Sequence, residues 1–154
     1  MIVYKVVRKL EDGMFSSLSV PESSPFFTHY YIGSRIERGW MGSWIFAYSD
    51  EKQAVEYLNE WEYGEPEDEE CEILICEADM IGKVEFFACP GEVDDMIHMW
   101  NRMLRGDMRH FDDCFTCIYS GAIFVENLVP LSVSNWSDRY KVTENAGLFT
   151  VEEL

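Results

Sequence analysis

The sequence predicts an α+β fold in which two main helices pack against a mostly antiparallel sheet. Segments rich in β-branched residues outnumber segments with helical periodicity, and turn signals join neighbouring strand segments as hairpins rather than as strand–helix–strand units. The chain has 154 residues, of which 47% are hydrophobic, which is enough to bury a core. No repeat or linker divides it, so we expect a single compact domain over residues 1–154.

The first part of the chain is expected to supply four strands. Residues 2–9 (IVYKVVRK) are rich in β-branched side chains and partly alternate, which is typical of a strand. The turn signal Asp12-Gly13 then predicts a hairpin with residues 15–20. Residues 27–33 (FTHYYIG) and 43–49 (SWIFAYS) are rich in aromatic and β-branched residues and are also expected to be strands.

The first helix is expected directly after the fourth of these strands. Ser49 or Asp50 can cap it, because a short side-chain oxygen accepts hydrogen bonds from the free amides of a first helical turn. Gly64 and Pro66 end the helical pattern. Between these limits one apolar stripe recurs at helical spacing, made by Ala54, Val55, Leu58 and Trp61.

The remaining elements are four strands, over residues 71–78, 83–88, 114–120 and 122–133, and a second helix over residues 92–104. In the helix, apolar residues keep the 3.6 period, acidic residues gather at the start and arginines at the end, as the helix dipole favours. The last two strands are expected to pair as a hairpin around Ser120-Gly121. The tail from Ser134 is polar and contains only short strand-like pieces.

The charge of the chain is large and unevenly placed. The formal net charge is −17, of which residues 51–100 carry −14 and residues 1–50 carry none. The run EYGEPEDEECE (62–72) has seven acidic residues and no basic one. Such a field repels nucleic acid and anionic membrane and attracts basic proteins, so we expect no direct nucleic-acid or membrane binding.

The cysteines and histidines do not form a recognisable metal or catalytic motif. His110, Cys114 and Cys117 have donors that suit zinc, but a second closely spaced pair is missing. Residues three apart on a strand also point to opposite faces, which would separate Cys114 from Cys117. No phosphate-binding loop or calcium-binding pattern occurs either. We therefore expect no metal and no cofactor, and the sequence favours a binding protein over an enzyme.

Two further features concern the compartment. The stretch of about 20 apolar residues that a membrane helix needs is absent, and the first residues do not form a secretory signal. Five cysteines, an odd number, suggest reduced thiols. These observations predict a cytoplasmic protein.

The first functional hypothesis is a small acidic protein that binds or inhibits a basic partner. One such partner is a nucleic-acid-handling enzyme, in whose positive groove the acidic surface would take the place of a phosphate backbone. An aromatic residue would add an apolar anchor. The residues expected to carry this binding are Glu60, Glu62, Glu65, Glu67, Asp68, Glu69, Glu70, Glu72 and Trp40. The alternative is a solvated run that only keeps the protein soluble and monomeric.

Much of the chain resembles a loose group of uncharacterised proteins from phages and mobile elements. The likeness follows a YKVV-like opening strand, a Y-x-I-G segment, an F-A-Y strand that leads into a helix, and a late hairpin. It is carried by Tyr4, Lys5, Tyr31, Gly33, Phe46, Ala47, Ala54, Tyr57, Gly121, Pro130 and Leu131. This resemblance implies a phage or mobile-element origin and no particular activity.

The segment IFAYSDEKQAVEY (45–57) is also similar to part of the ADP-ribosyltransferase-like fold. In that superfamily an Arg or His on the first strand grips the dinucleotide, a Ser or Tyr follows on a middle strand, and a later Glu acts on the ribose. The resemblance implies an alternative function as such an enzyme or as a nucleotide-binding domain. Its cleft would lie near Arg8, Ser49 and Glu126.

Overall fold

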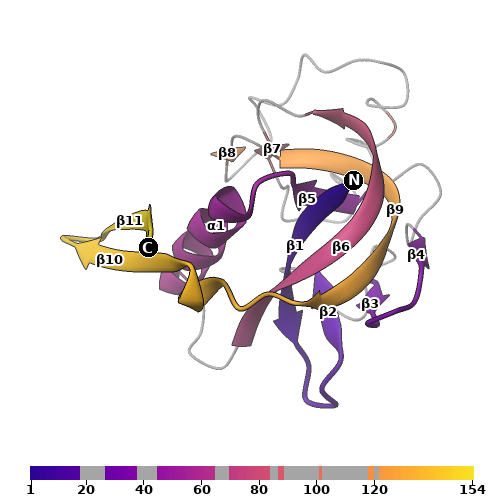
Figure 1. The fold of residues 1–154 in the computed structure, drawn as a ribbon, viewed down its shortest axis with the longest axis horizontal. Coiled ribbons are helices and arrows are strands. Elements are labelled where there is room, and N and C mark those ends of the chain that lie inside the picture. Colours follow the sequence, from indigo (N-terminus) through magenta and orange to yellow (C-terminus); the bar gives the residue numbers. More distant parts are fainter. Residues whose placement is uncertain are drawn as a thin grey trace.

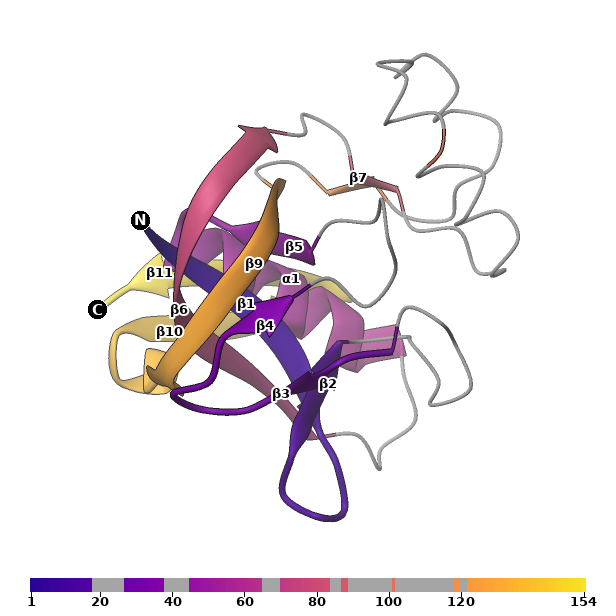
Figure 2. The ribbon, with the colours of Figure 1, turned by 90° about the vertical axis from the view of Figure 1, so that its right-hand side faces the viewer.

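A computed structural model describes residues 1–17, 27–37, 45–64, 70–83, 87–88, 101, 118–119 and 122–154. Its main sheet has seven strands, and all of the described pairings are antiparallel (Figures 1 and 2). These strands are β1 (Ile2–Lys9), β2 (Phe15–Ser17), β3 (His29–Tyr30), β4 (Ile36–Glu37), β5 (Ile45–Tyr48), β6 (Glu70–Lys83) and β9 (Ala122–Val133). The other elements are helix α1 (Glu51–Gly64), β7 (Phe87–Ala88), β8 (Ile118–Tyr119), the 3-10 turn η1 (Trp136–Asp138), β10 (Tyr140–Asn145) and β11 (Leu148–Glu153).

Four strands of the main sheet close into a ring. β1 pairs with β6 over its whole length, β6 pairs with β9, β9 pairs with β5, and β5 returns to β1 at the Tyr4–Tyr48 pair. The β6–β9 ladder contains three register shifts, and such irregularities bend and twist a strand. Figure 1 shows β6 and β9 curving together around the same space. The result is a small barrel, with β2 and β3 continuing from β1 and with β4 beside β9.

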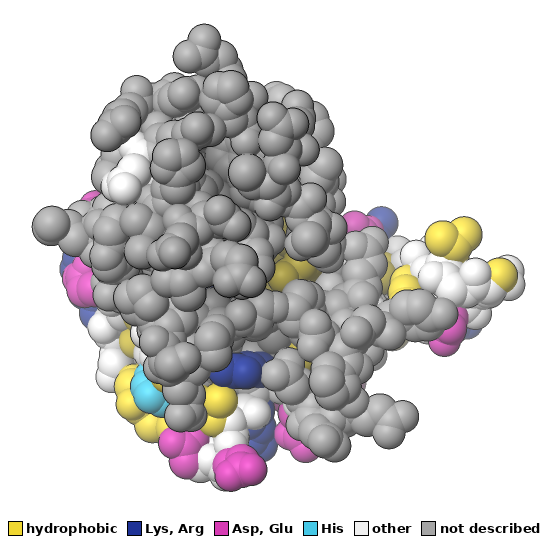
Figure 3. Space-filling view, turned by 180° about the vertical axis from the view of Figure 1, so that it is seen from behind, with side chains coloured by type: hydrophobic (Ala, Val, Ile, Leu, Met, Phe, Trp, Pro, Cys, Tyr) yellow, Lys and Arg dark blue, Asp and Glu magenta, His cyan; other side chains and the backbone are white. Residues whose placement is uncertain are grey.

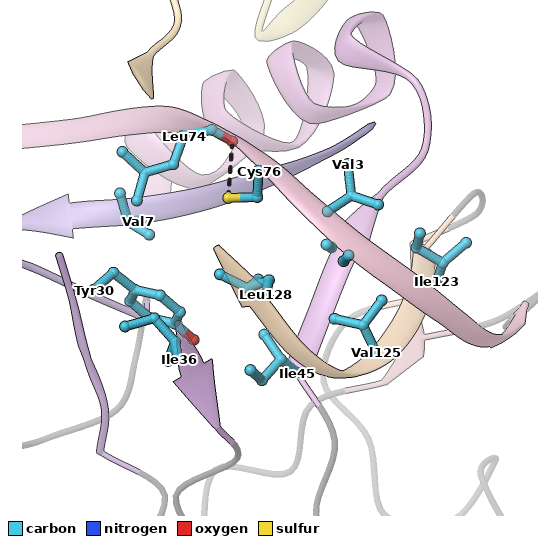
Figure 4. Packing of buried hydrophobic residues seen from close by; sticks show 12 residues of the cluster. Val3, Val7, Tyr30, Ile36, Ile45, Leu74, Cys76, Ile123, Val125 and Leu128 are labelled. Atoms are coloured by element: carbon cyan, nitrogen blue, oxygen red, sulfur yellow. Dashed lines mark hydrogen bonds between the residues drawn. The ribbon is translucent and has the colours of Figure 1, made fainter. Parts of the chain in front are cut away.

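The barrel core is formed by the inward-pointing side chains of these strands (Figure 4). Alternate residues of β1 face inward, so Val3, Lys5 and Val7 are all buried. The Lys5 ammonium lies 5.8 Å from the centre of the Tyr30 ring, a cation–π contact that partly offsets its loss of hydration. The apolar members of this core are Val3, Val7, Tyr30, Ile36, Ile45, Ala47, Leu74, Cys76, Ala78, Ile123, Val125 and Leu128.

A second core lies between the outside of the barrel and α1. The apolar stripe of α1 packs against Val6 and Ile73 of the barrel, and the hairpin β10–β11 adds Val151 to the same cluster. Figure 1 shows α1 with the barrel strands on one side and the hairpin on the other. The predicted stripe is thus confirmed for Ala54, Val55 and Leu58, each of which is fully buried.

The expectation of two main helices packed on the sheet is wrong. Strands make up 60% of the described residues, and α1 is the one α-helix whose bounds lie within them. Asn101 is the one described residue of the expected second helix, 92–104, and it is helical, while the rest of that segment lies outside the described ranges. The layer beyond α1 comes instead from the polar tail. In it, β10 half-buries Tyr140 and Val142, and β11 half-buries Phe149 and buries Val151, so the remaining positions are exposed and the segment shows little overall hydrophobicity.

Two of the expected strand arrangements also differ from the structure. The segments 71–78 and 83–88 correspond to two strands, as expected, but the bounds differ, because β6 continues to Lys83 and β7 covers only Phe87–Ala88. The hairpin expected around Ser120-Gly121 is not among the described pairings, since β8 pairs with β7 and β9 pairs with β4, β5 and β6. The physical reason is that both edges of β9 pair with strands of the main sheet, one edge with β4 and β5 and the other with β6.

In the turn between β3 and β4, Gly33 has a backbone conformation that residues with a side chain rarely adopt. Gly33 has φ +84°, and its N–H donates to the Pro130 carbonyl at 2.7 Å. A Cβ at this position would meet no atom within 4 Å, so any cost of substitution comes from the backbone alone. We expect Gly33→Ala to lower the free energy of unfolding by about 1–2 kcal/mol. Urea unfolding measures this, and equal stability of Gly33→Ala and the control Ser34→Ala would contradict it.

Candidate functional site

The acidic run joins the end of α1 to the start of β6. Glu60 and Glu62 lie in the last two turns of α1, and Glu70 and Glu72 are the first and third residues of β6. Both ends of the run are therefore held by regular structure (Figure 1). We call Glu60–Glu72 the acidic junction. The remaining residues predicted to bind the partner lie outside the described ranges, and they are Glu65, Glu67, Asp68, Glu69 and Trp40.

The N-terminal cap fixes where α1 begins. The Asp50 side chain accepts a hydrogen bond from the Lys52 amide at 2.9 Å, so Asp50, rather than Ser49, serves as the cap. From there the buried face of the helix lies on the barrel. At the other end, the last turn contains no basic residue. Glu62 instead lies in this last turn, with Glu60 directly before it, and a negative charge in the last turn opposes the helix dipole at a cost of about 0.3–1 kcal/mol.

The start of β6 also places negative charge where that charge lowers the stability of the fold. Glu70 is exposed and lies opposite Lys9 of β1, whereas Glu72 is half-buried and lies opposite Val7. Burial raises the pKa of Glu72 above its usual value, and the nearby Glu70 carboxylate raises this pKa further, while Lys9 partly opposes both effects. Residues two apart on a strand share a face, so Glu70 and Glu72 are like charges on one side of β6.

The raised pKa of Glu72 predicts a pH-dependent stability. Because the pKa of Glu72 is higher in the folded state than in the unfolded state, the protonated carboxyl favours folding at low pH. This contribution to stability is lost as the pH rises from the unfolded pKa through the folded pKa. Glu72→Gln removes this loss, so the variant should gain stability relative to the natural chain as pH rises above about 4.5. The gain should vanish below that pH. Urea unfolding between pH 3 and 7 measures it, and the same trend in the exposed control Asp79→Asn would contradict the assignment.

The residues of the alternative enzyme hypothesis lie at separate places. The Arg8 side chain donates from Nε to Ser16 Oγ at 2.8 Å. Ser49 follows β5, whose last residue Tyr48 pairs with Tyr4 of β1. Tyr4 and Arg8 are four residues apart on an extended strand, about 13 Å. The register therefore places Ser49 near the other end of β1 from Arg8.

Glu126, the third of these residues, is exposed on β9. Its neighbour Val125 pairs with Ile45 at the start of β5, whereas Ser49 follows the end of β5. The strand register thus separates Glu126 from Ser49 by the length of β5. The described structure does not bring the three residues of this hypothesis into one cleft.

The described cysteines are reduced thiols without a metal-binding arrangement. Burial raises the pKa of the Cys76 thiol to about 12, which keeps it protonated at neutral pH. Its Sγ donates to the Leu74 carbonyl at 3.6 Å (Figure 4). Among the residues that the structure describes, no group of three or more His, Cys, Asp or Glu side chains is placed to hold a metal ion. His110, Cys114 and Cys117 lie outside those ranges.

The structure adds a feature that the sequence reasoning missed, a row of aromatic rings along β3. Phe27 and His29 meet edge to face with ring centres 4.9 Å apart, and His29 and Tyr31 are 5.9 Å apart. Figure 3 views the molecule from behind the view of Figure 1, and at its lower left it shows a histidine among hydrophobic side chains, beside acidic side chains. The alternation of FTHYY was a signal for this row, because positions two apart on a strand share a face.

Comparisons with family models, with curated proteins and with solved structures give no match to this chain. The two resemblances drawn from the sequence therefore stay predictions. In the part of the chain that the structure describes, no helix is long and apolar enough to cross a membrane.

Proposed function

We propose that this chain is a cytoplasmic binding protein that presents its acidic junction to the basic surface of a partner protein. The partner class that suits this charge best is a nucleic-acid-handling enzyme, because such enzymes have positively charged grooves. An acidic protein that occupies such a groove inhibits the enzyme by competing with nucleic acid. The proposed activity is thus recognition and inhibition rather than catalysis.

One observation carries the proposal: the fold keeps negative charge where that charge opposes its own stability. Glu60 and Glu62 lie at the unfavourable end of α1, and Glu72 is half-buried beside Glu70 with a raised pKa. Sequence features that weaken a fold are found mainly at functional sites. A basic partner would supply the missing opposite charges and turn each of these penalties into binding energy.

The test compares three immobilised forms of the protein. The first is the natural chain. The second has its junction neutralised by Glu67→Gln, Asp68→Asn, Glu69→Gln and Glu70→Gln. The third is a control in which the same amount of charge is removed from exposed positions elsewhere, by Glu11→Gln, Asp79→Asn, Glu144→Gln and Glu152→Gln. Each is exposed to a panel of purified nucleases, polymerases and helicases at 50 mM and 300 mM salt.

We expect the natural chain and the control to retain the same enzymes at low salt, and the junction variant to lose them. Raising the salt to 300 mM should release them, because exposed charges are then screened within about 6 Å. Duplex DNA should displace them as well, if the junction occupies a nucleic-acid groove. Equal retention by the junction variant and the control would refute the proposal.

A further inference from the structure

The C-terminal hairpin is self-contained in its backbone hydrogen bonding. β10 and β11 pair with each other and, in the described pairings, with no strand of the main sheet. The turn between them has positive φ at Ala146 and Gly147, and the Leu154 amide donates to the Arg139 carbonyl at 2.9 Å to close the open end. We call residues 136–154 the strap.

The backbone connection from the strap to the barrel is short. The Ser134 amide donates to the Ile73 carbonyl at 2.7 Å, which continues the β6–β9 ladder. Asn135 follows and begins the 3-10 turn, whose bonds run from the Asp138 amide to the Asn135 carbonyl at 3.0 Å and from the Arg139 amide to the Trp136 carbonyl at 2.9 Å. Asn135 is therefore the joint at which the strap leaves the barrel.

Among the described residues, an ion pair between Arg139 and Glu51 joins the strap to α1. Arg139 directs Nε, at 2.8 Å, and its terminal Nη2, at 2.7 Å, to the same Glu51 oxygen, and Nη2 also donates to Ser134 Oγ at 3.1 Å. The Glu51 side chain is 8% exposed and that of Arg139 is 47% exposed. Both charges can be hydrated when the pair is broken, so its loss leaves no unpaired buried charge.

The apolar contact of the strap is one-sided. Val151 is its buried apolar residue, while Trp136, Tyr140 and Val142 are half-buried against the same cluster. The barrel cluster holds twelve buried residues. Because apolar burial is the main term that favours folding, the strap is held much more weakly than the barrel strands.

We infer that the strap opens and closes over α1 as one unit, hinged at Asn135 and latched by the Arg139–Glu51 pair, while the barrel stays closed. Opening hydrates Glu51 and uncovers the side of α1 that Val151 contacts. Since α1 ends in the acidic junction, the strap controls how firmly that helix is held. The inference rests on the fold alone and holds whether or not the junction binds a partner.

Hydrogen exchange measured by mass spectrometry tests this inference on the full chain. In the natural protein, strap amides should exchange at least about tenfold faster than amides of β1, β6 and β9. Arg139→Met should speed strap exchange by a further tenfold or more, as expected for losing charge-assisted hydrogen bonds, and should leave the barrel rates unchanged. Lys141→Met, at an exposed residue of β10, is the matched control and should change neither rate.

Salt gives a second reading that needs no variant. Raising the salt from 0.05 M to 0.5 M should speed strap exchange and leave barrel exchange unchanged, because the latch is partly exposed. If Arg139→Met does not fold, Arg139→Lys keeps the charge but loses the two-nitrogen contact, and it should show the same selective increase. Exchange of strap and barrel at one common rate, with a common response to salt and to the variants, would overturn the inference.

Discussion

Leu128→Ala is expected to lower the free energy of unfolding by about 2–5 kcal/mol. Leu128 is fully buried on β9, where it pairs with Ile36 of β4 and Ala78 of β6. A closed ring has little freedom to move inward and fill the space that the lost side chain leaves. The cavity cost should therefore add to the lost burial of apolar surface and place the effect in the upper part of that range. Urea unfolding followed by circular dichroism measures it.

The matched control is Leu131→Ala, three residues further along the same strand. Leu131 is 47% exposed, and its removal should cost well under half as much as that of Leu128. The comparison keeps strand, residue type and substitution constant and varies burial. Similar losses for the two variants would show that the barrel interior is not the main source of stability.

Neutralising four carboxylates of the acidic junction is expected to change binding and stability in opposite directions. The variant replaces Glu60, Glu62, Glu70 and Glu72 with glutamine. Affinity for a basic partner at low salt should fall by about 100-fold, roughly 0.7 kcal/mol for each charge. The free energy of unfolding should rise by about 1 kcal/mol, because two charges leave the negative end of the α1 dipole and a half-buried carboxylate is removed.

Two measurements on the same samples check this result. Titration calorimetry at 50 mM salt with a captured enzyme gives the affinity, and thermal unfolding gives the stability. The control is the four-residue variant with substitutions at exposed positions outside the junction. A loss of both affinity and stability would contradict the prediction, since it would mean that the junction carboxylates support the fold.

Local patterns in the sequence predicted the elements of the fold better than their arrangement. The β-branched run of β1 and the cap and apolar stripe of α1 were visible because each depends on residues close in the chain. The closed ring was not visible, since β1 pairs with β6 across more than sixty residues and the register shifts of β6 leave no local signal. The strand-like pieces of the tail were visible, but their pairing into the strap was missed because Asn145-Ala146-Gly147-Leu148 lacks the Asn-Gly or Asp-Gly pair that marks a tight hairpin turn.

The candidate site was predictable to a similar degree. Composition located the acidic junction, because the charge density of 62–72 needs no structure to be seen. Composition could not show that Glu72 is half-buried or that Lys9 lies across from Glu70, since both depend on the pairing of β1 with β6. The proposed grouping of Arg8, Ser49 and Glu126 depended on register in the same way, and the register separates them.

The closed ring has a consequence for synthesis on the ribosome. β1 is made first, its partner β6 much later, and β9, which closes the ring, only at residues 122–133. Until then the nascent chain exposes unpaired strand edges, which are prone to aggregate. The segment made in the interval, residues 51–100, has a net charge of −14, and we expect its mutual repulsion to keep neighbouring nascent chains apart. Chains arrested before and after β9 has left the exit tunnel should differ sharply in their resistance to protease.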